Sequence, residues 1–296
     1  MKQWVKMSIW VGILMFGLCL QNSIALTGHY TNGAEGIKAA SLPPPGYYWR
    51  LYNCLYTSNE NMDAYGNKLP IDFDITLYGL INRFIWVSKT EILGGNYFSD
   101  LIIPVLNIDL KVGALGVDDR EFGLSDICFE PFGISWHGAQ YDAAVAFGVY
   151  APTGEADEPV ALGKDYWTGM FTWGGTYYLD SEKTLSGSVL ARYEIHTEQN
   201  DSDIRAGNDF HFEWGLGKTI AKVWDVGLAG YCHWQVSQDS GKGSGDIKDR
   251  VYGIGPEVIG FLPPIKLFVS LRGIWEFEAK DRPEGTITTL TLTKIF

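Results

Sequence analysis

Long runs in which apolar and polar residues alternate dominate this sequence. In the clearest run, IKLFVSLRGIWEFE, Leu267, Leu271 and Trp275 fall on one face of an extended chain, and Arg272 and Glu276 fall on the other. The run is 14 residues long, whereas strands usually have about five or six. A strand of this length can cross a bilayer at a tilt, so the pattern predicts a membrane-spanning strand.

The same pattern recurs about twelve times along the chain. The runs begin near Tyr47, Ile71, Tyr97, Phe122, Gln140, Tyr166, Leu185, Asn208, Val223, Asp249, Ile265 and Glu284. Short connections such as LDSEKT and FLPPI alternate with long acidic ones such as GEADEPVALGKD and SQDSGKGSGDIKD. This alternation is typical of outer-membrane barrels, which have short periplasmic turns and long extracellular loops. The predicted fold is all-β, a transmembrane antiparallel barrel of about twelve strands with acidic loops outside.

The first 25 residues are predicted to be a secretory signal peptide. Two lysines precede an apolar run over residues 7–20, and the small residues Ser23 and Ala25 precede the expected cleavage point. The apolar run is shorter than the ~20 residues that a spanning helix needs. We therefore expect cleavage and not a membrane anchor.

Residues 26–46 lack the alternating pattern of a strand. They are rich in glycine and small residues and contain the three consecutive prolines Pro43, Pro44 and Pro45. Proline cannot donate a hydrogen bond to a β-ladder. These residues are compatible with a plug, a lid or a disordered leader before the first strand. We predict that the segment lies in the lumen and that residues 47–296 form the barrel.

The chain ends within an alternating run, TITTLTLTKIF. In lipid, an unpaired strand edge costs several kcal/mol for each backbone group, so the last strand is expected to close against the first. The terminal Phe296 resembles the C-terminal signal that the barrel-assembly machinery reads. Lys294 departs from the apolar or aromatic residue that is usual in that signal.

Composition and charge support a membrane barrel and exclude other classes. The chain is 14% aromatic, with 11 Trp and 35 Gly, as expected for aromatic belts on a barrel. Its net charge of −12 argues against nucleic-acid binding, which favours a basic surface. Three cysteines remain after the signal peptide, with no partner spacing, so neither a disulfide framework nor a metal site is predicted. No cofactor is implied.

Four segments, taken in order, carry a family resemblance: AEGIKAASLPPPGYY, DICFEPFGISWH, APTGE and LGKDYWTGMFTWGGTYYLD. Together they resemble the outer-membrane channel family associated with the meta-pathway of phenol degradation. The resemblance covers nearly the whole chain after the signal peptide. It implies a twelve-stranded barrel in the bacterial outer membrane, an N-terminal segment inside the lumen, and uptake of hydrophobic small molecules.

Polar residues on the predicted inner faces are candidates to line the lumen. They are Glu130, Arg192, Glu213, Asp225, His233, Lys266, Arg272 and Glu276. Because their charges are mixed in sign, a self-neutralised interior is favoured. A constriction that selects permeants by charge is the alternative.

Prolines within strands are candidates for a defect in the wall, because proline lacks the N–H that seals a ladder. Pro104 and Pro131 fall in neighbouring predicted strands, and Gly133 adds no side chain to close a gap. The alternative is that each proline marks a bulge, which is the reading we favour for Pro256. A wall defect would let a hydrophobic permeant leave sideways into the membrane.

The predicted function is diffusive uptake of small, mainly hydrophobic compounds, aromatic ones included. The alternatives are an outer-membrane enzyme of the lipid-hydrolase kind and a structural or adhesive barrel. No histidine has a partner at a catalytic spacing, so no catalytic residue is predicted. The expected partners are outer-membrane lipid, lipopolysaccharide, a small hydrophobic permeant and the assembly machinery, and we expect a monomer.

Overall fold

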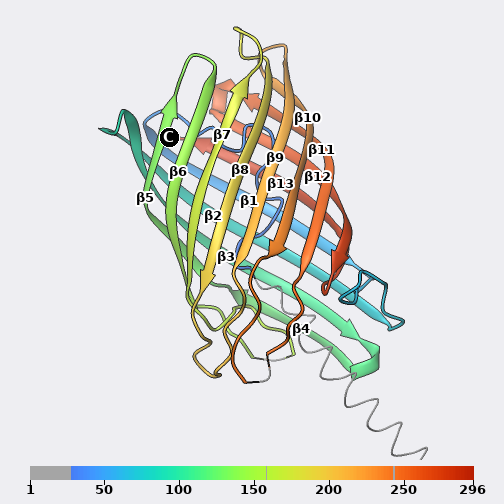
Figure 1. Ribbon diagram of the computed structural model, residues 1–296. Coiled ribbons are helices and arrows are strands. Elements are labelled where there is room, and N and C mark those ends of the chain that lie inside the picture. The colour runs from blue at the N-terminus through green and yellow to red at the C-terminus, as the bar shows by residue number, and fades with distance from the viewer. Residues whose placement is uncertain (1–27, 158, 243) are drawn as a thin grey trace, which may run out of the picture.

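The computed structural model describes residues 28–157, 159–242 and 244–296. Thirteen strands form one antiparallel sheet that closes into a barrel (Figure 1). Their bounds are β1 (Gly46–Ser58), β2 (Phe73–Ile92), β3 (Gly95–Val112), β4 (Val117–Leu124), β5 (Ile127–His137), β6 (Tyr141–Ala151), β7 (Thr168–Tyr178), β8 (Leu185–His196), β9 (Asp209–Ile220), β10 (Trp224–Gln235), β11 (Arg250–Leu262), β12 (Leu267–Lys280) and β13 (Thr286–Ile295). The predicted signal peptide lies outside the described residues.

Helical structure in the described residues is limited to two 3-10 turns, η1 (Gly113–Leu115) and η2 (Pro263–Ile265). No helix in this part of the chain is long and apolar enough to span a membrane.

The last strand closes the ring, as the sequence predicted. β13 pairs with β1 in an antiparallel ladder that includes Trp49 opposite Lys294. The backbone N–H of Phe296 donates to the carbonyl oxygen of Tyr47 at 3.2 Å. The ring has twelve positions because β4 and β5 share one of them, so the prediction of an antiparallel barrel of about twelve strands is confirmed.

That shared position is divided between two short strands. β4 pairs with β3 over Val105–Val112, whereas β5 pairs with β3 between Asn96 and Ile102. Only Ser125 and Asp126 separate the two strands. The sequence pattern had predicted one uninterrupted strand from about Phe122. Figure 1 shows β4 and the end of β3 projecting beyond the rest of the barrel.

The two rims of the barrel differ in the length of their connections. Short turns, such as those at 93–94 and 221–223, lie at the same end as the C-terminus, and long loops such as 197–208 and 236–249 lie at the other (Figure 1). In outer-membrane barrels the short turns are periplasmic. We call this end the inner rim and the opposite end the outer rim.

Side chains alternate between the lipid-facing surface and the interior. On β12, Leu271 and Trp275 are 50% and 56% exposed, whereas Arg272 between them is 3% exposed. Near the outer rim the rings of Trp234, Tyr252 and Phe277 contact in sequence across β10, β11 and β12. A second aromatic row near the inner rim joins Tyr47, Trp86 and Tyr97 on β1, β2 and β3. Two such belts are typical of a barrel that spans a membrane.

Residues 28–45, called the leader from here on, thread the interior and join β1 at the inner rim (Figure 1). The leader passes so close to the wall that a Cβ atom on Gly215 would lie 2.5 Å from the carbonyl oxygen of Gly36. The prediction of an N-terminal segment inside the lumen is confirmed. Of its three prolines, Pro43 lines the central cavity, whereas Pro44 and Pro45 are exposed where the leader meets β1.

Candidate functional site

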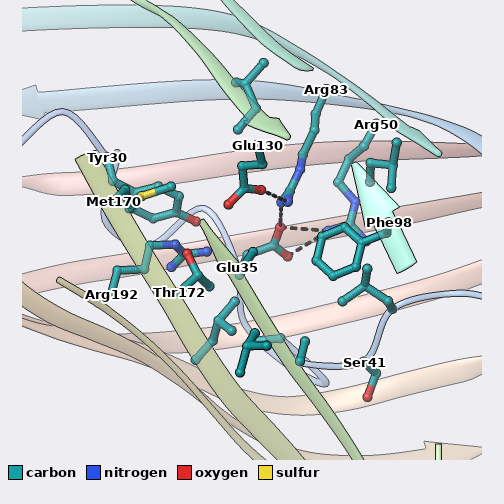
Figure 2. Close-up of a pocket in the computed structure, with 18 of the residues that line it drawn as sticks. Tyr30, Glu35, Ser41, Arg50, Arg83, Phe98, Glu130, Met170, Thr172 and Arg192 are labelled. Atoms are coloured by element: carbon teal, nitrogen blue, oxygen red, sulfur yellow. Dashed lines mark hydrogen bonds and ion pairs between the residues drawn. The ribbon is translucent and has the colours of Figure 1, made fainter. Parts of the chain in front are cut away.

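One leader carboxylate joins the leader to the wall in the middle of the barrel. Glu35 is 8% exposed. It accepts hydrogen bonds from Arg50 Nη1 at 2.7 and 2.8 Å and from the Tyr52 hydroxyl at 2.6 Å. Arg83 Nη1 lies 3.5 Å from the same carboxylate. Figure 2 shows Glu35 between these two arginines, which come from β1 and β2.

Arg83 extends this network across the wall. Its Nη2 donates to Asp100 on β3 at 2.5 Å and to Glu130 on β5 at 2.8 Å. Glu130, a predicted lumen-lining residue, is thus an interior carboxylate in an ion pair. The network joins four neighbouring wall strands to the leader.

A second contact lies on the opposite wall. The Arg192 guanidinium on β8 lies 3.6 Å from the centre of the Tyr30 ring, a cation–π contact. Arg192 Nη1 and the Tyr30 hydroxyl donate to Glu213 at 2.7 and 3.0 Å, and the Glu35 backbone N–H donates to it at 2.8 Å. The predicted residues Arg192 and Glu213 therefore form an ion pair that includes the leader.

Two further wall groups bind the leader backbone. Arg272 Nη1 donates to Glu257 at 2.8 Å, while its Nη2 donates to the Ala34 carbonyl at 2.5 Å. The Ile37 backbone N–H donates to Glu257 at 2.6 Å. The leader is therefore fixed by its backbone as well as by Glu35.

The remaining predicted lumen residues differ in their surroundings. Asp225 accepts from the leader's Lys38 at 2.9 Å. Glu276 accepts from the hydroxyls of Tyr56 and Tyr231 at 3.0 and 2.5 Å. Lys266 is exposed and ends the η2 turn, with a positive φ of 46°. The prediction that Lys266 lines the lumen is wrong, because β12 begins one residue later and the alternation does not extend into the turn.

The cavity between the leader and the wall in the middle of the barrel is small. A cavity of about 50 Å³ lies between leader residues such as Ala39 and Leu42 and wall residues such as Met170, and it has room for only a few water molecules. The buried charges that surround it are paired with opposite charges, and removing one partner of such a pair typically costs about 3–5 kcal/mol. The arrangement is a plugged barrel with a largely self-neutralised interior.

The ladder along β3 is interrupted where β4 ends and β5 begins. Residues that form a hydrogen-bonded pair in an antiparallel ladder exchange two N–H···O bonds. Pro104 on β3 accepts a bond from the Ser125 N–H at 3.0 Å but has no N–H to return. The Ser125 carbonyl instead accepts a bond from the Thr153 hydroxyl at 3.0 Å. The ladder therefore stops at Pro104, and a loop side chain replaces the missing bond.

Asp126, beside this break, binds both the loop and the leader. Its Oδ1 accepts the Gly154 N–H at 2.9 Å, and its Oδ2 accepts the Lys164 N–H at 2.8 Å and contacts His29 Nε2 at 2.8 Å. Gly154 and Lys164 belong to the loop between β6 and β7, called loop 152–167, in which residue 158 is not described. One carboxylate thus connects the wall, this loop and the plug.

Loop 152–167 covers the wall beside β4. Within the described residues, β4 pairs with β3 and with no strand on its other edge, whereas β5 also pairs with β6. Val160 and Leu162 of the loop pack against an apolar cluster that includes Phe73 and Leu110 on β2 and β3. Apolar packing and a few hydrogen bonds, not a ladder, hold this part of the wall.

The other predicted wall-defect residues do not lie at a break. Pro131 lies in a bulge, where the β5–β6 register shifts between Phe129 and Phe132, and pairing with both neighbours includes Gly133. The Phe98 ring covers Gly133 so closely that a Cβ there would lie 2.2 Å from it. The defect predicted near Pro104 and Pro131 is therefore confined to the Pro104 side. The bulge predicted at Pro256 is also wrong, because the β11–β12 register does not shift there.

The predicted lumen residue His233 lies in the outer half of the interior. Its Nε2 lies 3.0 Å from Asp249 and 3.4 Å from Asp209, and its Nδ1 lies 3.1 Å from the Asn32 amide nitrogen of the leader. His196 and His211 are buried in the same region. Imidazole and carboxylate groups thus concentrate toward the outer rim.

Sequence reasoning missed four residues that organise the site: Glu35, Arg50, Arg83 and Asp126. A signal existed for Arg50, because it alternates with the outward-facing Trp49 and Leu51 within a predicted strand. Glu35 lies in the segment without a periodic pattern. Asp126 gave no signal, since it lies in what the pattern predicted to be a continuous strand.

Comparison with known families and structures agrees with this fold. The sequence profile of a family described as "Putative MetA-pathway of phenol degradation" matches residues 58–292. No curated protein sequence matches the chain.

Solved structures are similar in fold at low sequence identity. An outer membrane channel from Pseudomonas putida F1 superposes with a TM-score of 0.78 at 12% identity, covering 90% of this chain and 100% of that one. The translocator domain of the autotransporter NalP from Neisseria meningitidis gives a TM-score of 0.49 at 9% identity, with 87% and 91% covered. The first likeness shows a shared barrel fold. Together with the family match, the fold and its apolar, aromatic-belted surface place the barrel in the bacterial outer membrane.

Proposed function

The chain belongs to the family described as the putative MetA-pathway of phenol degradation, and from this membership we propose a channel for diffusive uptake of small, mainly hydrophobic compounds, aromatic ones included. We further propose that the permeant leaves sideways, through the wall beside Asp126. The observation that carries this proposal is the break in the ladder at Pro104, which loop 152–167 covers without strand pairing.

The physical reason for a sideways exit is the hydrophobic effect. An apolar molecule that reaches the periplasm enters water, whereas one that leaves through the wall enters hydrocarbon, which is favoured in proportion to its apolar area. Opening the break requires loop 152–167 to release the contacts of Thr153, Gly154 and Lys164. It requires no ladder to separate.

The leader must also move for a permeant to pass, because it threads the interior and the cavity beside Ala39 and Leu42 is only about 50 Å³. Its residue His29 and the loop both bind Asp126. Displacement of the leader would therefore remove one of the groups that hold the region of the break. In this proposal, displacement of the leader and opening of the sideways exit are coupled.

Cross-linking tests the route. Cysteines at Ser125 and Thr153, joined by a short bifunctional thiol reagent, should block uptake of a hydrophobic fluorescent probe into cells and leave ion conductance unchanged. The matched control joins Leu271→Cys to Leu290→Cys, which lie opposite each other in the continuous β12–β13 ladder and should have no effect. Uptake that persists after complete cross-linking at 125 and 153 would exclude this exit.

Liposome permeation separates the channel from the alternatives. A channel admits the probe into liposomes without consuming lipid. Release of fatty acid by the purified protein would favour a lipid hydrolase, and a barrel that neither permeates nor hydrolyses would favour a structural or adhesive role.

A further inference from the structure

Three residues in the outer half of the lumen bring metal-binding atoms together. Glu194 and His196 lie two positions apart on β8 and therefore face the same side, while His29 comes from the leader. One ring nitrogen of each histidine and one carboxylate oxygen of Glu194 lie within 4.8 Å of one another. The side chain of His29 is only 3% exposed, and His196 and Glu194 are buried.

The two histidines are oriented in the same way. Their Nε2 atoms point outward to carboxylates, His29 to Asp126 at 2.8 Å and His196 to Asp209 at 3.0 Å. Their Nδ1 atoms converge, each 2.6 Å from the Thr168 hydroxyl. A histidine that binds a metal almost always donates its other ring N–H to a carboxylate, a carbonyl or water, and this donation leaves the inner nitrogen free to coordinate.

Hydrogen-bond counting among the described side chains leaves one of the two Nδ1 atoms without a donor. If each neutral histidine donates its Nε2–H to its carboxylate, both Nδ1 atoms are acceptors. The Thr168 hydroxyl has one hydrogen and can donate to only one of them. The second Nδ1 needs either a further proton or a metal ion.

We propose that His29, His196 and Glu194 bind one divalent transition-metal ion of the zinc class, which fastens the leader to β8. Two imidazoles and a carboxylate are a common ligand set for such ions. Donor atoms around tetrahedral zinc are about 3.3 Å apart, so the donors must approach by on the order of 1 Å. Leader residues can make this adjustment without disturbing a ladder.

The surrounding charges suit a cation. Asp126 and Asp209 stand behind the two histidines, and Lys164 is the basic side chain that faces these carboxylates. A second group, Asp209, His233 and Asp249, offers similar atoms. It has a single histidine, so it is the weaker candidate. In both groups a carboxylate already has partners: Glu194 contacts His211 Nε2 at 2.9 Å and accepts the His29 backbone N–H at 2.7 Å, and Asp249 accepts from Arg282 at 3.1 Å.

Metal titration of the purified, metal-stripped full-length mature protein tests the proposal. Zn²⁺ should bind with one ion per barrel in calorimetry, and Co²⁺ should give the visible absorption of a tetrahedral nitrogen and oxygen site. His29→Ala and His196→Ala should each abolish binding. Asp126→Asn should weaken it by about 10–100-fold, the usual effect of losing an outer partner of a ligand.

The matched control is His137→Ala. His137 also contacts an aspartate, Asp142, at 2.9 Å, but at the inner rim, so this variant should bind metal as the parent does. His29 belongs to the leader, so its replacement leaves every wall strand intact, and circular dichroism confirms that each variant is folded.

Two results would overturn the proposal. Absence of Zn²⁺ and Co²⁺ binding to the folded parent would mean that a proton, not a metal, lies between the two rings. Binding that survives His29→Ala but is lost in His233→Ala would assign the ion to the other group.

Discussion

The barrel wall is held together in two different ways on its two sides. From β6 through β13 to β3, neighbouring strands are joined by ladders whose register shifts are confined to positions near the rims. Between β3 and β6, the outer part of the wall depends on β4, loop 152–167 and the carboxylate of Asp126. The contrast shows that a side chain can replace a ladder bond at a potential opening: the Thr153 hydroxyl donates to the Ser125 carbonyl, which Pro104 cannot do.

The leader contacts both kinds of wall. Near the barrel centre, Glu35 binds Arg50 and Arg83 on continuously paired strands. Toward the outer rim, His29 binds Asp126 beside the break. A change in the leader is therefore expected to alter the lumen and the break together.

Removal of leader residues 28–40 should have the largest effect. A barrel of this size has an interior only somewhat wider than its side chains, and the leader fills it, so the deletion should raise single-channel conductance from nearly closed to that of an open pore. Planar-bilayer recording measures it. A folded barrel with unchanged conductance would show that the leader does not block ions.

Glu35→Gln provides a graded form of the same test. It removes the charge that two buried arginines share while keeping the side-chain shape, and the loss of one partner from such a buried pair typically costs about 3–5 kcal/mol. We expect brief openings of the channel in planar-bilayer recording. Glu60→Gln is the control and should cause none, because Glu60 pairs with Lys68 in an exposed loop.

Asp126→Ala should have the next largest effect, and the effect should be confined to the side of the wall that contains the break. It leaves the N–H groups of Gly154 and Lys164 without acceptors, at about 1–3 kcal/mol for each unsatisfied group. Trypsin should then cut loop 152–167 at Lys164, and hydrophobic uptake should rise.

Asp180→Ala is the matched control on the continuously paired side. Asp180 likewise accepts two backbone N–H groups, those of Thr184 and Leu185, both at 2.8 Å, in the turn between β7 and β8. This variant should loosen its turn without changing uptake. An equal rise in uptake in both variants would mean that general destabilisation, not the break, controls entry.

The alternating pattern was sufficient to predict the strands, because their faces differ in polarity at every second residue. It predicted the closure of the last strand because backbone groups must be satisfied in lipid. The prediction that the leader lies in the lumen has other grounds: residues 26–46 lack the alternation and contain three consecutive prolines, and the family resemblance implies an internal segment. The prolines made Pro104 a candidate for a wall defect, but the sequence could not distinguish it from Pro131. The effect of Pro104 depends on its register with Ser125, which is set only when the strands pair.

Contacts over long separations explain the other misses. Glu35 lies 15 residues from Arg50 and 48 from Arg83, and no local pattern relates them. His29 contacts Glu194, which is 165 residues away in the sequence. No motif spacing could therefore have predicted the group formed by His29, Glu194 and His196. Lys266 was misplaced because a turn interrupts the alternation one residue before β12.

Pro104→Ala should close the break slightly. The new N–H points at the Ser125 carbonyl and competes with the Thr153 hydroxyl, adding about 0.5–1.5 kcal/mol for one hydrogen bond. Thermal unfolding should shift upward and hydrophobic uptake should fall. Pro256→Ala, opposite Leu228 in the continuous wall, should leave uptake unchanged, and equal uptake in the parent and Pro104→Ala would contradict the role of the break.

The smallest effect expected is a pH response confined to the continuously paired side. Asp281 lies in the outer hairpin between β12 and β13, and its backbone N–H donates to the Asp63 carbonyl at 3.1 Å. Burial, with Asp249, Asp239 and Asp63 nearby, raises the pKa of Asp281 to about 6. The folded state therefore binds a proton more tightly than the unfolded chain, whose aspartates titrate near 4.

The hairpin should accordingly gain stability as the pH falls from about 6 to about 4, by no more than about 1 kcal/mol because solvent screens a partly exposed group. Hydrogen exchange of the hairpin amides across this range measures the gain. Asp281→Asn should remove the pH dependence, and hydrophobic uptake should not follow it, because the break lies on the other side of the wall. An uptake profile that tracks the titration of Asp281 would show that the two sides are coupled.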